Sequence, residues 1–154
     1  MKRKTLSNKE KRELNNLIEK YNFQFDKKYI VEIIEDVKHK VVKSNNEVLF
    51  FYIGDEIYPS LKFALNQEIA LKKITVDMGA VKFVVNGADI MRPGIVEIEE
   101  GIESGEIVVI VDINNKKPLA IGRAMYGFVE LGSKDSGKVI ENLHFIGDEI
   151  WNMR

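Results

Sequence analysis

The chain has 154 residues, is 45% hydrophobic and 31% charged, and carries a formal net charge of -1, which excludes the disordered class. Its length suits one ordinary domain or two small ones. It contains no cysteine, so disulfides, thiolate metal sites and a cysteine nucleophile are excluded. No apolar run approaches the ~20 residues of a membrane span, and the amino end has no apolar core for a secretion signal. We therefore expect a cytoplasmic protein without a membrane partner.

Residues 1–70 predict a small α/β domain. A helix should begin after Ser7, because Ser7 and Glu10 have the spacing of a capping box and an apolar stripe follows at helical spacing. That stripe consists of Leu14, Leu17, Ile18 and Tyr21. Residues 29–34 and 47–53 are rich in β-branched and aromatic side chains and predict strands, with turn residues at 44–46 between them. We expect a curved antiparallel sheet with the helix packed on it, then a short helix or turn at 61–65 and a linker at 66–68.

Residues 71–154 predict a second domain that is mostly β. Strands are indicated at 71–77, 107–111, 119–126 and 139–145, and the continuous apolar run at 107–111 is typical of a strand buried on both faces. Turns or loops are indicated at 114–118 and 132–138. Five or six short strands with one helix suit a small barrel. The expected fold class is therefore α+β.

The stretch from 76 to 95 concentrates three glycines and a proline around one short apolar segment. Asp77 has the position of an N-cap, and Gly87 that of a left-handed C-cap. Between them a two-turn helix should point Ala80, Phe83 and Val84 inward, with Lys82 and Asn86 outward. An extended piece at 88–91 and a turn at 92–94 should follow. Small residues on both sides of a helix leave backbone N–H groups open to a ligand with acceptor oxygens; they equally suit turn geometry alone.

Catalytic and metal-binding patterns are scarce in this sequence. His39 with Glu35 and His144 with Asp148 have helical spacing, but one histidine with one carboxylate is a poor metal signal, so we interpret both histidines as structural or surface residues. Acid–base catalysis by carboxylates stays open, because such pairs meet in space and not in the chain. The glycines at 79 and 87 do not form a dinucleotide fingerprint. We expect no enzyme activity, no cofactor and no metal site.

Two charged segments and four aromatic residues bear on ligand binding. Residues 1–20 are locally basic, whereas 97–112 hold six acidic and no basic residues. The acidic run is a poor place to dock phosphates and should face away from any RNA. The aromatic side chains are Phe50, Phe51, Tyr58 and Trp151. We expect all four to pack in the core or at a domain end. Phe50 and Phe51 are adjacent in a strand and point to opposite faces, so at most one of them should meet solvent.

The segments GAVKFVVNGADIMRPGI, GEIVVIV, PLAIGRAMY and NLHFIGDEIW together closely resemble a PUA domain, a small RNA-binding pseudo-barrel of mixed β-strands with short helices. With EVLFFYIGDEIYPSLKFAL before them, the chain resembles the malignant T-cell-amplified sequence family and its archaeal relatives. That resemblance implies an N-terminal pre-PUA domain at 1–70 and a PUA domain at 71–154. It covers nearly the whole chain, weakly before residue 47.

The resemblance implies an RNA-binding, non-enzymatic adaptor of the translation apparatus. Its partners would be RNA (tRNA or rRNA), the small ribosomal subunit and a translation-factor protein, as density-regulated protein is for eukaryotic members. Alternatives are an accessory subunit or targeting module for RNA modification, and a protein-interaction scaffold. Arg92 stands where the eukaryotic motif has a cysteine, which should strengthen phosphate binding.

The implied RNA-binding residues belong to two segments, one around the predicted short helix and the other at the end of a predicted strand. They are Gly79, Ala80, Lys82, Phe83, Asn86, Gly87, Ala88, Asp89, Ile90, Met91, Arg92, Pro93, Gly94, Arg123, Ala124, Met125 and Tyr126.

Overall fold

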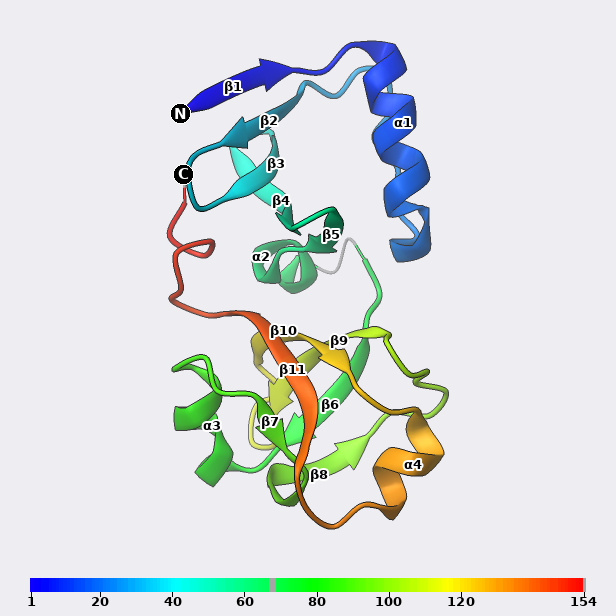
Figure 1. Cartoon of the computed structure of the whole chain (residues 1–154), viewed down its shortest axis with the longest axis vertical. Helices are drawn as coiled ribbons and strands as arrows, with labels where there is room; N and C mark the ends of the chain where they lie inside the picture. Colours follow the sequence, from blue (N-terminus) through cyan, green and yellow to red (C-terminus); the bar gives the residue numbers. More distant parts are fainter. Residues whose placement is uncertain (67–68, 154) are drawn as a thin grey trace. The chain divides into compact units, whose positions relative to one another are not determined.

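The computed structural model describes residues 1–66 and 69–153 and places them in two compact units (Figure 1). The first unit is Met1–Ala70 together with the chain end from Asn152, and the second is Leu71–Trp151. Each unit has its own β-sheet, and the predicted α+β class is confirmed. Most of the predicted linker at 66–68 lies outside the described residues. Among the described residues, no helix is long and apolar enough to cross a membrane.

Five antiparallel strands form the sheet of the first unit, in the order β1-β2-β3-β4-β5. They are β1 (Lys2–Thr5), β2 (Val31–Glu35), β3 (Lys40–Ser44), β4 (Glu47–Ile53) and β5 (Glu56–Pro59). The predicted turn at 44–46 is confirmed, because Asn45 and Asn46 both have positive φ and form the two-residue turn that a tight hairpin requires. Strands β1, β3 and β5 were not predicted. The charged sequence of β1, KRKT, contains only one strand-forming residue, Thr5. Lysine is nevertheless common on edge strands.

Helix α1 (Asn8–Ile18) begins with the predicted capping box and continues into the 3₁₀ turn η1 (Glu19–Tyr21). Ser7 Oγ accepts from the Glu10 amide at 3.1 Å, and Glu10 Oε1 accepts from the Ser7 amide at 3.0 Å. Placing Leu17 on the inward stripe was wrong, since this side chain is 51% exposed. Lys11 lies on the buried face, and its Nζ donates to the carbonyl oxygens of residues 27 and 29 at 2.7 and 2.9 Å.

An aromatic cluster fills the core of the first unit. Phe50 is fully buried and lies within 5.4–6.2 Å, between ring centroids, of four other aromatic rings. These rings belong to Tyr21, Phe23, Phe25 and Phe63. Phe51 and Tyr58 are also buried and contact each other, so the expectation that these strand aromatics pack in the core is confirmed. The short helix or turn predicted at 61–65 is helix α2 (Leu61–Leu65), which is capped by Ser60.

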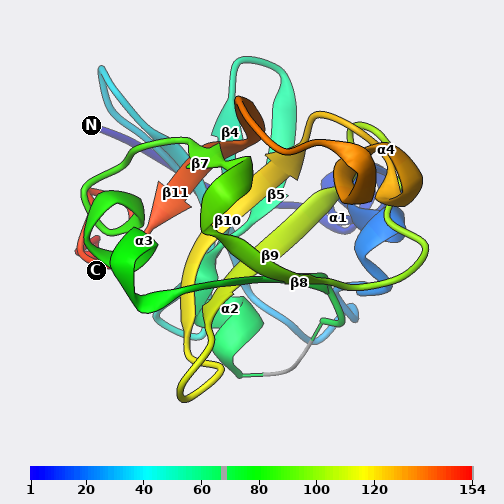
Figure 2. The same ribbon diagram turned by 90° about the horizontal axis from the view of Figure 1, so that it is seen from below.

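Six strands form the mixed sheet of the second unit, in the order β7-β11-β10-β9-β6-β8 (Figure 2). They are β6 (Lys72–Val76), β7 (Ile90–Met91), β8 (Ile95–Ile98), β9 (Ile107–Asp112), β10 (Pro118–Ala124) and β11 (Lys138–Phe145). The β6–β9 pair is parallel, whereas the other pairs are antiparallel. Helices α3 (Met78–Val84) and α4 (Phe128–Ser133) lie on opposite flanks of the second unit, and the 3₁₀ turn η2 (Arg92–Gly94) joins β7 to β8.

Two elements of the second unit were not predicted. Strand β8 was missed because acidic residues alternate with its apolar ones, and α4 was missed because it is a single short segment of six residues. The helix runs to Ser133, so the predicted loop at 132–138 begins two residues later than expected. The continuous run of β9 is almost entirely buried, as predicted.

The expected structural role of His144 is confirmed. Its ring is buried, and Nδ1 lies 2.8 Å from Oδ2 of Asp148 in the turn that follows β11. The same carboxylate accepts from the backbone amides of Phe145 and Trp151. His39 lies in the turn between β2 and β3, with its Nδ1 3.7 Å from Asp36 Oδ1.

Gly122 lies in β10 where the chain approaches β11 too closely for a side chain. A Cβ at this position would be 2.7 Å from Ile140 Cγ2 and 3.0 Å from the carbonyl oxygen of Glu141. We predict that Gly122→Ala lowers the free energy of unfolding by about 1–3 kcal/mol, because overpacking displaces neighbouring atoms. Urea denaturation measures this change. Gly132→Ala is the matched control: a Cβ there meets nothing within 4 Å, and equal destabilisation by both variants would contradict the packing argument.

The Asp148 carboxylate makes the stability of the second unit pH-dependent. Burial alone raises the pKa of this group, but the interactions with His144, Trp151 and Phe145 outweigh burial and leave the pKa below its ordinary value. The ionised form therefore stabilises the fold above the unfolded-state pKa of ~3.9, and this contribution is lost as pH falls through the folded-state pKa. We predict that unfolding free energy, measured in urea at several acidic pH values, falls less steeply with pH in Asp148→Asn than in the wild type. Asp135→Asn, in an exposed loop, should retain the wild-type slope.

Candidate functional site

A groove of about 690 Å³ lies beside α3 in the second unit, and we call it the α3 groove. Its lining comes from α3, the segment up to β7, the turn η2 and the start of β11. The lining residues are Asp77, Gly79, Ala80, Phe83, Val84, Ala88, Asp89, Ile90, Met91, Pro93, Gly94 and Lys138. Nine of the implied RNA-binding residues thus come together around one groove. Asp77, Val84 and Lys138 were not among the implied residues.

The predicted N-cap and the small residues of the groove wall are present as expected. Asp77 Oδ1 accepts from the Ala80 amide at 2.9 Å, so one of the amides that the sequence left open for a ligand is already occupied. The Asp77 amide donates to the carbonyl oxygen of Gly94 at 2.9 Å, which brings η2 against the start of α3. A Cβ on Gly94 would lie only 3.0 Å from Ala80 Cβ. Small residues are therefore required for this close approach.

Gly87 ends α3 with positive φ, as predicted. Its φ is 92°, and the amides of Gly87 and Ala88 donate to the carbonyl oxygens of Val84 and Phe83, both at 3.0 Å. These two bonds are those of a Schellman motif. A Cβ on Gly87 would lie 2.9 Å from the Phe145 ring, so the helix end packs directly on β11.

Phe83 points outward, so the prediction that it faces the core was wrong. Its side chain is 58% exposed, whereas Val84 is buried. A helix of seven residues has room for only a narrow buried face, and Val84 with the partly buried Ala80 occupies it. Lys82 is on the exposed side as predicted, and its Nζ lies 5.2 Å from the Phe83 ring centroid. An exposed aromatic ring with a cation over one face thus lies at the edge of the groove.

Asp89 supplies a carboxylate on the side of the groove away from α3, and residues of β11 hold this carboxylate in place. Its Oδ1 accepts from the Asn142 amide at 2.8 Å, and Oδ2 lies 3.3 Å from Lys138 Nζ. The Asn142 side chain also donates to the carbonyl oxygens of Val84 and Ala88 at 3.1 and 3.0 Å. Sequence reasoning missed Lys138 and Asn142, because nothing in their local sequence shows that β11 lies beside α3.

Arg92 has a role inside the fold. Its Nε donates to the carbonyl oxygen of Leu131 at 2.8 Å, and a terminal nitrogen donates to that of Ile95 at 3.1 Å. These bonds tie η2 to α4 and β8. Arg92 does not line the α3 groove, and neither do the implied residues Lys82, Asn86 and Gly87.

The implied residues at the end of β10 also lie outside the groove lining. Arg123 donates to Glu141 Oε1 from Nε and a terminal nitrogen at 3.1 and 2.6 Å. Ala124 is fully buried, whereas Met125 is exposed. Lys134 Nζ lies 4.2 Å from the ring centroid of Tyr126. The structure therefore gives these residues neighbours within the fold, and none of them lines the α3 groove.

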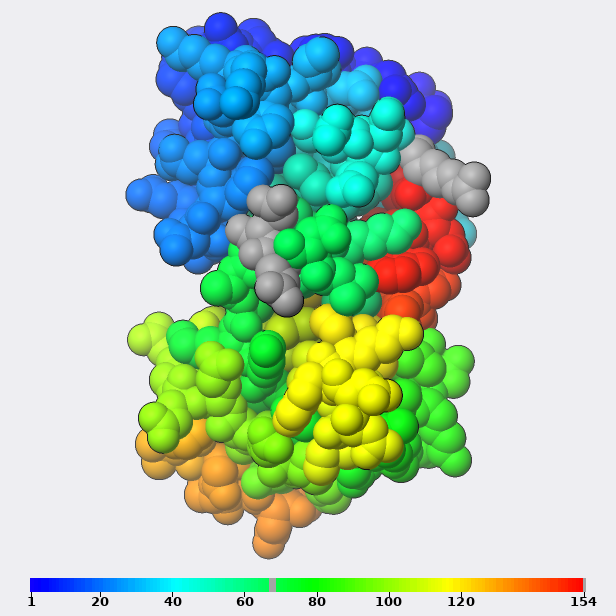
Figure 3. Space-filling view, turned by 180° about the vertical axis from the view of Figure 1, so that it is seen from behind, coloured from blue at the N-terminus to red at the C-terminus, as the bar shows by residue number. Residues whose placement is uncertain are grey.

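The acidic run at 97–112 is partly neutralised by lysines. Glu97 pairs with Lys116 at 3.1 Å, and Glu106 pairs with Lys72 at 2.8 Å. The loop after β8 and helix α3 lie on opposite sides of the second unit (Figures 1 and 3). None of the acidic residues of this run lines the α3 groove. The described residues contain no group of three or more histidine or carboxylate side chains that could hold a metal ion.

Two family models match the chain. Residues 72–146 match the PUA domain. Residues 2–67 match a domain of unknown function, DUF1947. The two matches correspond closely to the two units of the structure.

Characterised and uncharacterised relatives match along most of their length. Translation machinery-associated protein 20 of Saccharomyces cerevisiae is 41% identical over 133 residues, covering 82% of this chain and 74% of the yeast protein. Malignant T-cell-amplified sequence 1 of Danio rerio is 31% identical over 133 residues, covering 83% and 74%. An uncharacterized protein of Methanocaldococcus jannaschii is 38% identical over 144 residues, covering 94% and 89%.

Solved archaeal structures share the fold. A hypothetical protein of Pyrococcus horikoshii superposes with a TM-score of 0.81 at 29% identity, covering 97% of this chain and 98% of the other. A PUA-domain structure from Aeropyrum pernix gives a TM-score of 0.85 at 24% identity, covering 97% and 89%. The chain therefore belongs to the family of PUA-domain proteins that includes translation machinery-associated protein 20 and malignant T-cell-amplified sequence 1, as its sequence indicated.

Proposed function

We propose that this protein binds RNA through the α3 groove and acts in the translation apparatus as a non-enzymatic adaptor. The exposed ring of Phe83 at the edge of the groove is the observation that carries the proposal. An aromatic face open to solvent stacks on an unpaired nucleobase of any identity. The small residues of the groove wall allow nucleotides to come close to the backbone. The ligand is thus unpaired RNA, such as the end of a tRNA.

The phosphates of this RNA would be contacted by lysines at the groove. Lys82 lies beside Phe83, and Lys138 lies at the start of β11. Lys138 is paired with Asp89 but is half exposed, so its flexible side chain is able to turn toward a phosphate. Arg92 contributes mainly by fixing η2. With a formal net charge of -1, the protein has no overall positive charge to attract RNA, so its affinity for isolated RNA should be modest.

The family supports a role on the ribosome or on tRNA. Its yeast relative bears the name translation machinery-associated protein 20. Residues 72–146 match the PUA domain, and the sequence resemblance implies that this domain binds RNA. We therefore propose tRNA or rRNA, the small ribosomal subunit and a translation-factor protein as partners. The step would be initiation or recycling in the cytoplasm.

Binding to three ligands across a salt titration tests the proposal: deacylated tRNA, tRNA trimmed at its 3′ end, and small ribosomal subunits. We predict that trimming weakens tRNA binding, because the unpaired end is the part that enters the groove. Fluorescence anisotropy and subunit co-sedimentation measure the two kinds of binding. Binding to subunits alone would support ribosome docking without the tRNA contact. If none of the three ligands is bound, the protein is a scaffold instead.

Groove variants test the site itself. Phe83→Ala should weaken RNA binding by about 1–3 kcal/mol, the usual contribution of one aromatic–base stack. Lys82→Gln with Lys138→Gln should lower the salt slope of log affinity by up to about two, since each lysine contacts one phosphate. Val129→Ala and Lys117→Gln, both exposed outside the groove lining, are the matched controls. RNA affinity that is unchanged in Phe83→Ala would reject the assignment of the groove.

A further inference from the structure

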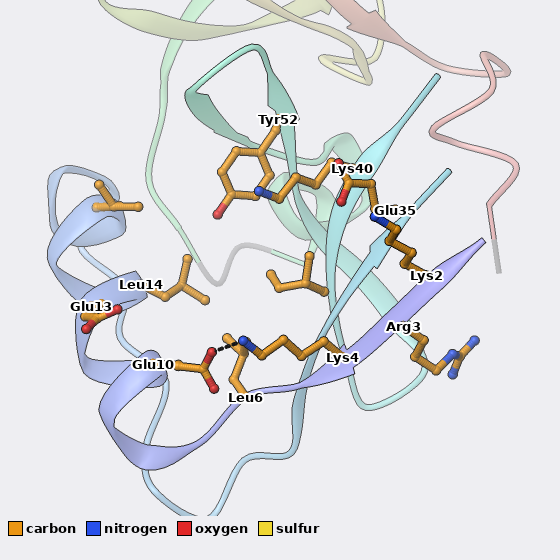
Figure 4. A pocket seen from close by; sticks show the side chains of 12 residues that line it. Lys2, Arg3, Lys4, Leu6, Glu10, Glu13, Leu14, Glu35, Lys40 and Tyr52 are labelled. Atoms are coloured by element: carbon orange, nitrogen blue, oxygen red, sulfur yellow. Dashed lines mark ion pairs between the residues drawn. The ribbon is translucent and has the colours of Figure 1, made fainter. Parts of the chain in front are cut away.

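A second groove lies in the first unit, between α1 and the β1 side of the sheet (Figure 4), and we call it the α1–β1 groove. Its volume is about 440 Å³. The apolar part of its lining consists of Leu6, Leu14, Leu17 and Ile33. Leu14 is buried in the core, whereas Leu17 is half exposed on the helix. The apolar side chain of Leu17 therefore lies partly open to solvent, because the described residues of the first unit do not cover it fully.

Charges on the strand side of the groove are unevenly balanced. The register pairs Lys2 with Glu35 and Glu35 with Lys40, so these three side chains project from the same face of the sheet. Within the described residues neither lysine forms an ion pair, and Lys40 Nζ lies 4.5 Å from the Tyr52 ring centroid. Lys4, in contrast, is paired with Glu10 of α1. Two lysines against one carboxylate leave the strand side of the groove with an excess positive charge.

Strand β1 also offers backbone groups. It is the edge of the five-stranded sheet, and in the described part of the chain it pairs only with β2. The free side of an edge strand carries N–H and C=O groups that an extended peptide can pair with. All four residues of β1 are exposed, and three of them are basic. Opposite charges directly across a strand pair are stabilising, so a strand added here is favoured when it is acidic.

The groove is poorly suited to nucleic acid. Glu10, Glu13 and Glu35 line it among four basic side chains, so its net positive charge is too small to hold a chain of several phosphates. One or two peptide carboxylates can still pair with Lys2 and Lys40. The floor of the groove is aliphatic, with one aromatic ring at the far end beside Lys40. Such a floor accommodates an apolar side chain better than a phosphate.

We propose that the α1–β1 groove binds an extended segment of a partner protein that carries an apolar anchor residue next to acidic residues. The segment adds to the edge of β1, its anchor rests on Leu17 and Ile33, and its carboxylates face Lys2 and Lys40. This interaction surface lies wholly within the first unit. It is independent of the RNA-binding function proposed for the second unit.

Selection of a random-sequence peptide display library on the full-length chain tests the proposal. The enriched peptides should share an apolar residue flanked by Asp or Glu. The most enriched peptide is then synthesised with a fluorescent label and titrated by anisotropy. Leu17→Asp should weaken its binding by about tenfold or more, as loss of a central anchor does at other interfaces. The double variant Lys2→Glu with Lys40→Glu should weaken it similarly, and exchanging the acidic peptide residues for lysine should restore binding to that variant.

Matched controls and a competing ligand complete the experiment. Val37→Asp and Lys28→Glu change exposed residues of the same unit outside the groove lining and should leave the affinity unchanged. Urea denaturation of each variant confirms that it is folded. The proposal is overturned if no peptide is enriched, if the enriched peptides bind Leu17→Asp as well as the wild type, or if basic sequences are selected. Binding of a labelled single-stranded oligouridine that is lost in the double lysine variant but not in Phe83→Ala would also overturn it, since the groove would then be a nucleic-acid site.

Discussion

Hydrogen bonds from Asn142 connect the end of α3 to β11, and the position of the α3 groove depends on these bonds. The Asn142 amide donates to the Asp89 carboxylate, while its side chain donates to two carbonyl oxygens at the end of α3 and just after it. These three bonds hold the end of the helix and the segment before β7 against β11. Gly87 allows the approach, because any side chain there would strike the Phe145 ring. A seven-residue helix has little stability of its own, so its position comes from these tertiary contacts.

The character of the groove follows from the same arrangement. Because Val84 occupies the buried face of α3, Phe83 is turned to solvent. Arg92, the cation that the sequence suggested for phosphates, is used within the fold to hold η2. The groove is therefore largely apolar, with lysines only at its edge. Such a surface suits base stacking supported by a few phosphate contacts, in keeping with a protein whose net charge is close to zero.

The two units present different kinds of surface. In the second unit the candidate site is built from small residues and an exposed ring beside a short helix. In the first unit the aromatic cluster around Phe50 stabilises the sheet, while a basic edge strand and the exposed Leu17 border a groove lined by both lysines and carboxylates. A chain that contacts RNA with one unit and a protein segment with the other would have the properties of an adaptor.

The amino-acid sequence by itself determined the local features: the capping box at Ser7, the Asn45–Asn46 turn, the Asp77 and Gly87 ends of α3 and the buried run of β9. Each of these depends on side chains a few residues apart. Its segment pattern was also distinctive enough to indicate the family. Tertiary structure alone decided that β1 joins the sheet despite its charges and that Leu17 and Phe83 face solvent. It also decided that Lys138 lines the α3 groove and that Asn142 bonds to the end of α3. These outcomes depend on which elements pack together over long sequence separations, from the β1–β2 pair, in which Lys2 faces Glu35, to Asn142 and Val84, which are 58 positions apart. No local periodicity records such a pairing.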